Sequence, residues 1–392
     1  MAAKDSYDVI VTGGGPAGSI TAKEAADRGL DVLLIEKRQE IGEPIRCAEG
    51  ITADGLREFM EPDPGWISGR IRKARFFSPS VSLEFCDDSD AAYVLERRIF
   101  DRDLARMAAG AGADVFTKTQ ATGLIIENGR TCGIRGKLRG EDFEARAKVV
   151  VGADGVESRV GRWAGIDTCL KVKDIGSCAQ FRLAGIDLEP DSCEIYYNRG
   201  WAPGGYVYIF PKGDGEANVG LGAVYDHGDP RRPIEYLKDF VSWRFPGAGV
   251  LESVAGGVPL SGIMSRLSAA GLVLVGDAAR LTDPGTGEGI LNGMISGRIA
   301  GRVIADCVRN GDVSADALRR YDIEIEKKLG PLLQRNYAVK EYLRKCSNAR
   351  MDVMFRTVKA MRIEKYPTST MVREVFNPRG RRAAALLGIL MR

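Results

Sequence analysis

The first third of the chain alternates short, fully apolar runs with stretches whose apolar residues recur at helical spacing. The runs at 8–12 and 31–35 predict buried strands, and the segment between them predicts an amphipathic helix that ends near residue 28. Two further buried strands are predicted to end at Gly152 and Gly276, and a long helix is predicted from about Gly287. Strands that alternate with helices in this way predict an α/β fold with a parallel sheet.

A different pattern occupies residues 203–211, PGGYVYIFP, where aromatic side chains stand at every second position. Tyr206, Tyr208 and Phe210 therefore share one face of a predicted strand, and Trp201 lies just upstream. The ordinary explanation of such a face is a packed core. The alternative is that the rings form one wall of a pocket.

Length and composition narrow the classes of protein. With 392 residues the chain is longer than one compact core usually carries, so two or three subdomains are expected. A net charge of +3 gives no indication of nucleic-acid binding. Eight cysteines without a CxxC or CxxxC pair predict neither a zinc site nor a disulfide framework. The single histidine, His227, lies in a polar turn and is expected at the surface, so no metal site is predicted.

No signal peptide is indicated, and no apolar run reaches the roughly 18 residues that a membrane-spanning helix needs. We therefore expect a cytoplasmic protein. The C-terminal segment combines Arg379, Arg381 and Arg382 with an apolar run at 383–391. This segment is compatible both with peripheral contact at the cytoplasmic face of a membrane and with an ordinary solvated helix.

The most informative motif is Gly13-x-Gly15-x-x-Gly18, which follows the first predicted strand and opens the first helix. Gly13 allows a sharp turn, Gly15 lets a pyrophosphate approach the backbone, and Gly18 lets the helix and strand pack closely. The phosphates would lie on the helix N-terminus, next to Ala17. Glu36 ends the second strand at the spacing expected of an acid that binds a ribose. The motif predicts a dinucleotide cofactor but does not distinguish NAD from FAD.

Three later segments, together with the glycine motif, are similar to the FAD-binding group typified by aromatic hydroxylases. They are the segment VLERRIFDRDLARM, the DG signature in Gly152-Ala153-Asp154-Gly155, and the GD signature in Gly276-Asp277. The resemblance covers about the first 310 residues and implies a Rossmann-type FAD-binding domain. It implies further FAD contacts at Arg97 (with Arg98 and Arg102 as alternatives), Ala121, Asp154, Asp277, Gly289 and Ile290.

The aromatic strand resembles the motif PxxYxWxFP of geranylgeranyl reductases, flavoenzymes that saturate polyprenyl chains. Pro203, Tyr206, Phe210 and Pro211 match, whereas Tyr208 stands where the pattern has Trp. The segment RCAEG at 46–50 resembles the loop that these enzymes place beside the flavin ring. The chain is most similar to the archaeal branch, which acts on digeranylgeranyl glycerophospholipids.

This resemblance implies FAD-dependent reduction of the C=C bonds of geranylgeranyl chains in archaeal ether lipids. It implies cofactor contacts at Cys47, Ala48 and Gly50, and substrate contacts at Trp201, Tyr206, Tyr208 and Phe210. Cys47 and Tyr206 are the catalytic candidates, and Glu49 is a further candidate for a proton relay. The alternatives are an FAD-dependent monooxygenase and a prenyl-binding escort protein without catalytic activity.

We expect three regions. A discontinuous FAD-binding domain comprises 1–172 and 263–310, a mainly β substrate domain comprises 173–262, and a helical C-terminal region comprises 311–392. Helices at about 314–365 are expected to close the far end of the lipid channel. Because no second GxGxxG motif occurs, the electron donor is expected to be either transiently bound NAD(P)H or a ferredoxin.

Overall fold

The computed structural model describes residues 4–225 and 231–360. Within these residues the chain forms two compact units, each assembled from three separate stretches. The first unit comprises 4–45, 97–170 and 261–334, and the second comprises 46–96, 171–260 and the residues from 335 onward. His227 and the basic C-terminal segment lie outside the described residues.

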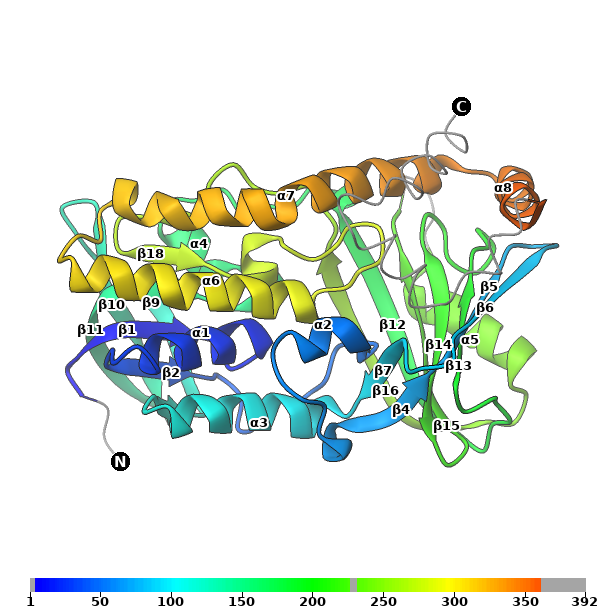
Figure 1. The fold of residues 1–392 in the computed structure, drawn as a ribbon, viewed down its shortest axis with the longest axis horizontal. Helices are drawn as coiled ribbons and strands as arrows, with labels where there is room; N and C mark the ends of the chain where they lie inside the picture. Colours follow the sequence, from blue (N-terminus) through cyan, green and yellow to red (C-terminus); the bar gives the residue numbers. More distant parts are fainter. Residues whose placement is uncertain (1–3, 226–230, 361–392) are drawn as a thin grey trace. The chain divides into compact units, whose positions relative to one another are not determined.

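The first unit is built on an eight-stranded sheet, and the α/β prediction is confirmed (Figure 1). Its strand order is β17 (Ser268–Ala269), β18 (Leu272–Leu274), β11 (Glu141–Gly152), β1 (Ser6–Thr12), β2 (Val32–Ile35) and β8 (Asp114–Phe116). The five strands from β18 to β8 are parallel, and β17 is antiparallel to β18. The hairpin of β9 (Thr119–Glu127) and β10 (Arg130–Leu138) extends from β11.

Helices accompany this sheet, and glycines bring the backbones of two of them close together. The helices of the first unit include α1 (Pro16–Ala26), α3 (Arg97–Gly110), α4 (Arg159–Trp163), α6 (Ile290–Arg309) and the start of α7 (Ala315–Lys345). Helix α6 runs alongside α1 (Figure 1) and turns Gly293, Gly297 and Gly301 toward it. A Cβ at Gly297 would lie 2.5 Å from the Ala17 carbonyl oxygen. Larger side chains in this stripe would force the two helices apart.

The second unit contains a seven-stranded sheet. Its order is β16 (Gly249–Pro259), β12 (Ile175–Ala184), β15 (Glu216–Ala223), β14 (Tyr206–Gly213), β13 (Ser192–Tyr196), β5 (Lys73–Phe77) and β6 (Ser82–Cys86). All neighbours are antiparallel except β13 and β5. A small sheet has the order β3 (Gly50–Thr52), β7 (Ala92–Leu95) and β4 (Ile67–Ile71), with α2 (Ala53–Arg57) following β3. The strand-rich middle of the chain is thus confirmed.

Two helices cover apolar surfaces of the second unit. Helix α5 (Pro233–Arg244) packs Leu237 and Phe240 against Val207, Ile209 and their neighbours in the large sheet. Helix α8 (Asn348–Ala360) contributes to a separate cluster that contains side chains of β6. No helix among the residues that the structure describes is long and apolar enough to cross a membrane. The assignment of a cofactor role, a lipid role and a closing role to separate regions stays a prediction.

Candidate functional site

The glycine motif lies where β1 ends and α1 begins, and its three glycines meet different surroundings. Gly13 has φ +122°, and a Cβ there would lie 2.3 Å from the Ala153 carbonyl oxygen. A Cβ at Gly18 would lie 1.9 Å from the Gly13 carbonyl oxygen. At Gly15, by contrast, a Cβ would meet no described atom within 4 Å. Gly13 and Gly18 are therefore needed for the turn itself, whereas Gly15 leaves space on its surface.

Helix α1 starts directly behind this space. Its N-cap is Gly15, no side chain caps it, and Pro16 stands in its first turn. An uncapped N-terminus presents backbone N–H groups and the positive end of the helix dipole, which suits a phosphate. Ala17, the expected neighbour of the phosphates, is the second residue of this helix.

Glu36 lies beside the same turn, at the carboxyl end of β2. Its Oε2 accepts a hydrogen bond from the Gly14 amide at 2.9 Å, and its Oε1 accepts one from the Arg38 amide at 2.8 Å. The Thr119 amide donates to the Glu36 carbonyl oxygen at 2.9 Å, so β9, which carries Ala121, begins next to Glu36. The structure thus brings Glu36 and Ala121 into one neighbourhood of the first unit.

Among the three candidate arginines of α3, Arg97 is the most buried. It forms a bidentate pair with Asp101, with Nε–Oδ1 at 3.0 Å and Nη2–Oδ2 at 2.6 Å, and the two side chains are 16% and 6% exposed. Arg98 and Arg102 pair instead with acidic residues of the segment 40–43. The charge of Arg97 also acts on Asp277, which places these two predicted cofactor residues near each other.

Two half-buried aspartates stand at the carboxyl ends of the neighbouring strands β11 and β18. Burial raises the pKa of Asp154, whose Oδ2 accepts from the Val160 amide at 3.1 Å. The buried Oδ1 of Asp154 has no hydrogen-bond partner among the described residues. Burial likewise raises the pKa of Asp277, which accepts a hydrogen bond from the Thr282 hydroxyl at 2.6 Å.

The N-terminus of α6 meets Asp277. Gly289 is the N-cap, and a Cβ at Gly289 would lie 3.2 Å from Asp277 Oδ1. Ile290 is the first residue of the helix and is buried. Gly276 approaches Ala17, because a Cβ at Gly276 would lie 2.9 Å from the Ala17 Cβ. The turns at 13–18 and 276–290 therefore converge.

These residues fit FAD. Among the described residues, the first unit offers the N-terminus of α1 without a side-chain cap, the N-terminus of α6 with a glycine N-cap, an open space at Gly15, and an Asp154 Oδ1 atom without a hydrogen-bond partner. All stand near the carboxyl ends of parallel strands, where α/β sheets bind nucleotides. N–H groups and positive helix ends suit the pyrophosphate, and carboxylates suit hydroxyl groups of ribose or ribityl chains.

Sequence reasoning did not single out Glu288. Burial raises the pKa of Glu288 to about 7, and its Oε1 accepts from the Leu291 amide at 2.7 Å. It stands immediately before the N-cap Gly289, so its carboxyl group accepts from the amide of the second residue of α6. An acidic residue directly before a predicted helix N-terminus was the available signal.

In the second unit, the predicted aromatic strand is β14. The ring centroids of Tyr206 and Tyr208 lie 6.4 Å apart, and those of Tyr208 and Phe210 lie 5.2 Å apart. Tyr197, in the loop after β13, extends the row, with its ring 5.8 Å from that of Tyr206. The opposite face of β14 carries Val207 and Ile209, which are fully buried in the core with α5.

Tyr208 stands where the reductase pattern has Trp, and its hydroxyl explains how it fits. The hydroxyl donates to Gln180 Oε1 at 2.7 Å. A Cβ at Gly220, on the neighbouring strand, would lie 2.3 Å from the Tyr208 hydroxyl oxygen. Burial raises the pKa of Tyr208 well above its ordinary value. The Tyr208 ring is therefore fixed over Gly220, and its hydroxyl group stays protonated.

The structure does not group Trp201 with these rings. Trp201 packs instead with Tyr196, Phe240 and Trp243, at centroid distances of 5.9, 5.1 and 4.6 Å. This cluster belongs to the core on the α5 side of the sheet, together with Val207. The turn between β13 and β14 carries Trp201 to that side, which its closeness in sequence did not reveal.

The loop at 46–50 lies at the Phe210 end of the row. A Cβ at Gly50 would lie 2.9 Å from the Phe210 Cε2 atom. The Glu49 amide donates to the sulfur of the half-buried Cys47 at 3.2 Å. Cys47, Ala48 and Gly50 therefore adjoin the aromatic row. Their predicted roles toward the cofactor, and that of Tyr206 toward the substrate, stay predictions.

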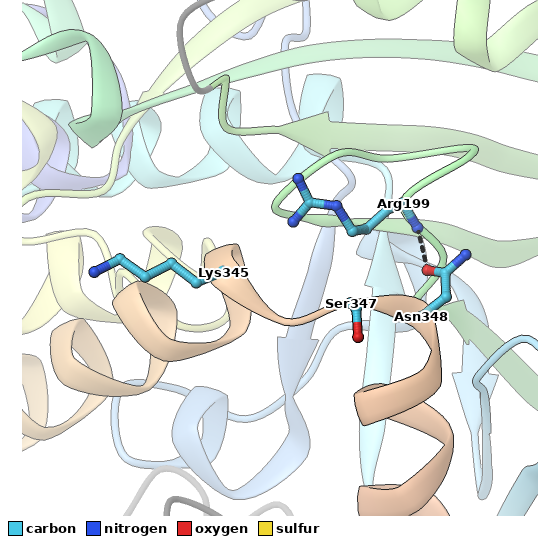
Figure 2. A pocket seen from close by; sticks show the side chains of 4 residues that line it. All are labelled: Arg199, Lys345, Ser347 and Asn348. Carbon is cyan, nitrogen blue, oxygen red and sulfur yellow. Dashed lines mark hydrogen bonds between the residues drawn. The ribbon is translucent and has the colours of Figure 1, made fainter.

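A polar cavity of about 510 Å³ opens elsewhere in the second unit, between the end of α7 and the start of α8 (Figure 2). It is lined by Arg199, Lys345, Ser347 and Asn348. The Arg199 guanidinium donates to the carbonyl oxygens of Arg344 and Cys346 at the end of α7. Lys345 is exposed and forms no ion pair with a described residue.

Comparisons with known proteins were made on the whole chain. A family model of the geranylgeranyl reductase catalytic domain matches residues 174–258, and one of FAD dependent oxidoreductases matches residues 8–206. A digeranylgeranylglycerophospholipid reductase of Methanocella arvoryzae is 55% identical over 99% of this chain and 100% of its own length. The protein of the same name from Methanosarcina acetivorans is 47% identical over 95% of this chain and 93% of its own.

A solved structure also matches over nearly its full length. It is that of a geranylgeranyl bacteriochlorophyll reductase-like protein from Thermoplasma acidophilum, with a TM-score of 0.91 and 36% sequence identity. The alignment covers 99% of each chain. The likeness therefore extends over both compact units.

Proposed function

The chain belongs to the geranylgeranyl reductase family of FAD-dependent oxidoreductases, and we propose that it reduces the carbon–carbon double bonds of a digeranylgeranyl glycerophospholipid. The observation that carries the proposal is the row formed by Tyr206, Tyr208 and Phe210, which ends at the loop of Cys47. A long unsaturated chain would lie along these rings. Two relatives that are 55% and 47% identical to this chain carry the name of this activity.

FAD, when bound and reduced, would supply a hydride for the reduction of the double bond. It would be held by the glycine turn, Glu36, Arg97, Asp154, Asp277 and the N-terminus of α6. The Tyr206, Tyr208 and Phe210 rings bind the apolar chain and exclude water. Their faces favour positive charge developing on a protonated alkene, by roughly 0.5–2 kcal/mol for each ring in contact. The Cys47 sulfur is the candidate atom for holding the proton that the alkene receives.

We also propose where the polar end of the lipid binds. Arg199 and Lys345 bring two positive charges to the polar cavity, and Ser347 and Asn348 bring hydrogen-bonding groups. Tyr197 connects this region to the row, since it contacts Tyr206 and stands two residues before Arg199. A phosphate in the cavity would leave the chain directed along the rings. Figure 2 draws the Lys345 ammonium turned away from the other three residues, so it would rotate toward a bound anion.

The test is an anaerobic single turnover. The flavoprotein is reduced with dithionite and mixed with the phospholipid, and flavin absorbance and lipid mass are followed together. Reoxidation of the flavin with a gain of two hydrogens per turnover supports the proposal. Flavin that stays reduced until air enters contradicts it and favours the monooxygenase alternative, whereas a colourless protein that binds prenyl lipid favours the escort alternative. Repeating the turnover with NADPH or a reduced ferredoxin in place of dithionite identifies the electron donor.

Contact with a membrane follows from the expected substrate, because a lipid with two geranylgeranyl chains resides in a bilayer. We propose peripheral contact at the cytoplasmic face. Co-sedimentation with vesicles of anionic lipid, compared with vesicles of neutral lipid, tests it. Equal recovery in the supernatant of both samples contradicts this part of the proposal.

A further inference from the structure

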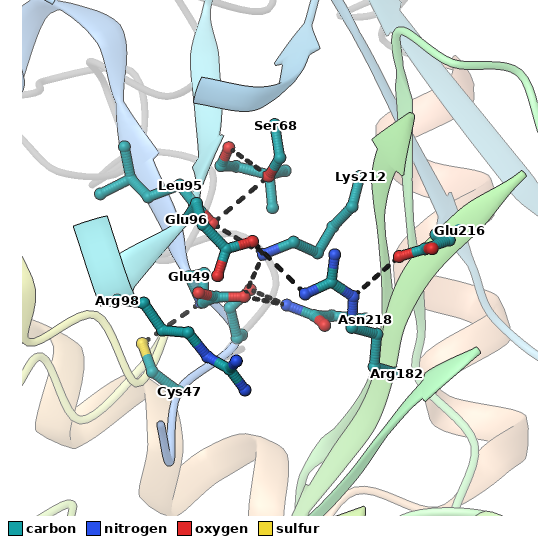
Figure 3. Close-up of polar contacts among 12 residues, drawn as sticks. Cys47, Glu49, Ser68, Leu95, Glu96, Arg98, Arg182, Lys212, Glu216 and Asn218 are labelled. Carbon is teal, nitrogen blue, oxygen red and sulfur yellow. Dashed lines mark hydrogen bonds and ion pairs between the residues drawn. The ribbon is translucent and has the colours of Figure 1, made fainter. Parts of the chain in front are cut away.

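A cluster of charged and polar side chains with a buried centre lies beside the Cys47 loop (Figure 3). We call it the Lys212 cluster; its members are Glu49, Glu96, Arg182, Lys212, Glu216 and Asn218. Lys212 stands at its centre with a side chain that is 0% exposed. Its ammonium donates to Glu49 Oε2 at 2.5 Å and to the Leu95 carbonyl oxygen at 2.9 Å. Glu96 Oε2 lies 3.3 Å from it, so three oxygens surround its three protons.

Glu49 joins this cluster to the loop. Its side chain is 4% exposed, and Oε2 accepts a second hydrogen bond from Asn218 Nδ2 at 2.7 Å. The same Asn218 nitrogen donates to the Ala48 carbonyl oxygen at 3.3 Å. Lys212 and Asn218 therefore hold both the side chain of Glu49 and the backbone just before it.

The backbone of Glu49 is in a conformation that needs such support. Its φ is +72°, a left-handed value that a non-glycine residue adopts at a cost and only when its surroundings impose it. In this conformation its carbonyl oxygen accepts from the Leu95 amide at 2.8 Å, and its own amide donates to Cys47 Sγ at 3.2 Å. The direction of the N–H that reaches the sulfur thus depends on the anchoring of the carboxylate.

Stability alone does not account for the cluster. Taking an ammonium and a carboxylate out of water is costly, and apolar side chains of similar volume usually stabilise a core as well or better. Buried ion pairs are best attested where they select one conformation among several. The conformation selected here is that of the loop at 46–50.

We infer that Lys212 is a positioning residue, which acts through Glu49 to hold the Cys47–Gly50 loop and to direct the Glu49 amide at the Cys47 sulfur. Glu49 itself is then an anchor of the loop. The consequence for catalysis rests on the proposed function, because there the loop adjoins the substrate rings and is predicted to contact the cofactor. The geometry of the loop does not depend on that proposal.

The test is the alkylation of individual cysteines by iodoacetamide in the purified full-length protein, read out by peptide mass spectrometry. In Lys212→Met the carboxylate of Glu49 loses its counter-charge and moves toward water, carrying the loop with it. Alkylation of Cys47 should accelerate about tenfold through this local opening. Cys132 and Cys307, which are buried, should stay protected. If these two cysteines stay unmodified, the faster alkylation of Cys47 reports local movement of the loop and not global unfolding of the protein.

Lys340→Met is the matched control. Lys340 is 4% exposed and pairs with Asp174 at 2.9 Å, so its loss breaks a comparable buried pair in the same unit. Its other polar contacts are with Lys173, Leu260 and Glu341, which lie outside the loop. It should lower Tm to a similar extent without changing the alkylation of Cys47. Equal acceleration in Lys340→Met and Lys212→Met would overturn the inference, and so would an unchanged rate in a folded Lys212→Met protein.

Asn218→Leu provides a second variant in case Lys212→Met does not fold. It removes the hydrogen bonds to Glu49 and Ala48 without leaving an unpaired charge, and it should accelerate alkylation of Cys47 about threefold. No acceleration overturns the inference. In lipid turnover, a positioning role predicts a lower kcat at unchanged KM for the lipid. If the wild type does not reduce the lipid, the proposed function fails, and the alkylation rates still decide the role of Lys212.

Discussion

Two glycines three residues apart should respond in opposite ways to the same substitution. Gly15 has φ −75° and ψ −179°, an extended conformation that alanine adopts readily, and a Cβ there would meet no described atom within 4 Å. Gly15→Ala should therefore leave the free energy of unfolding of the apoprotein unchanged or raise it by about 0.4–1 kcal/mol, because alanine restricts the unfolded chain. The new methyl group would occupy the space that suits a pyrophosphate.

The alanine methyl group would crowd the pyrophosphate space beside Gly15, and the cost of this crowding determines how much the affinity for FAD falls. Overpacking by one methyl group costs about 1–3 kcal/mol, so the Kd for FAD should rise about 5- to 150-fold in Gly15→Ala. Gly18→Ala differs because its Cβ would lie 1.9 Å from the Gly13 carbonyl oxygen and 3.1 Å from the Ala153 Cβ. Backbone must move to relieve these contacts, so the same cost of at least about 1–3 kcal/mol appears in folding.

The assay pairs urea unfolding of the apoprotein with titration of FAD, followed by flavin fluorescence. Gly110→Ala is the control, because Gly110 ends α3 and a Cβ there also meets no described atom within 4 Å. It should match Gly15→Ala in stability and the wild type in FAD affinity. A Gly15→Ala protein that binds FAD like the wild type would refute the reasoning. So would one destabilised as much as Gly18→Ala, since Gly15 would then serve the turn and not the cofactor.

Three further outcomes are expected. Burial raises the pKa of Glu288 from the ordinary 4.5 to about 7, so between these two pH values the folded apoprotein keeps a proton on this carboxyl group that the unfolded chain has lost. The free energy of unfolding should therefore fall by about 3 kcal/mol as pH rises from 4.5 to 7. Urea unfolding of Glu288→Gln should not show this fall. Tyr206→Leu should lower kcat/KM for the lipid about tenfold by removing a ring face, whereas Tyr208→Phe should keep turnover and lose about 1–2 kcal/mol of stability in urea. Lys345→Met should raise KM for the phospholipid about three- to fivefold without changing kcat, and leave KM for the corresponding lipid without phosphate unchanged.

Local patterns in the sequence predicted what local physics determines. The strand, turn and helix around Gly13, Gly15 and Gly18 follow from apolar runs and glycine spacing, and the structure has them as β1 and α1. Alternation likewise predicted β14 and the shared face of Tyr206 and Tyr208. Each of these inferences needed only one short, continuous stretch of the chain.

Inferences that depend on distant partners could not be drawn in this way. Lys212 follows the aromatic strand and reads as an ordinary charge at a strand end, yet its burial depends on Glu49, which is 163 positions away. The pairing of β5 with β13 also joins residues that are remote in sequence, and both strands belong to the second unit. Trp201 was grouped with the rings because it is near in sequence, but its side chain belongs to the other face.

The same face of β14 changes from rings to a buried ammonium between Phe210 and Lys212, and the chemistry of the rings constrains that change. Two residues along a strand span about 7 Å, and a bare positive charge at that distance would oppose a cationic alkene by about 2 kcal/mol at an effective dielectric constant of 20. Glu49 and Glu96 remove this opposition by surrounding the ammonium. By electrostatics alone, Lys212→Met would then leave net negative charge and favour the cation. The electrostatic effect of Lys212→Met alone would therefore raise kcat. A lower kcat in this variant would instead point to displacement of the Cys47 loop.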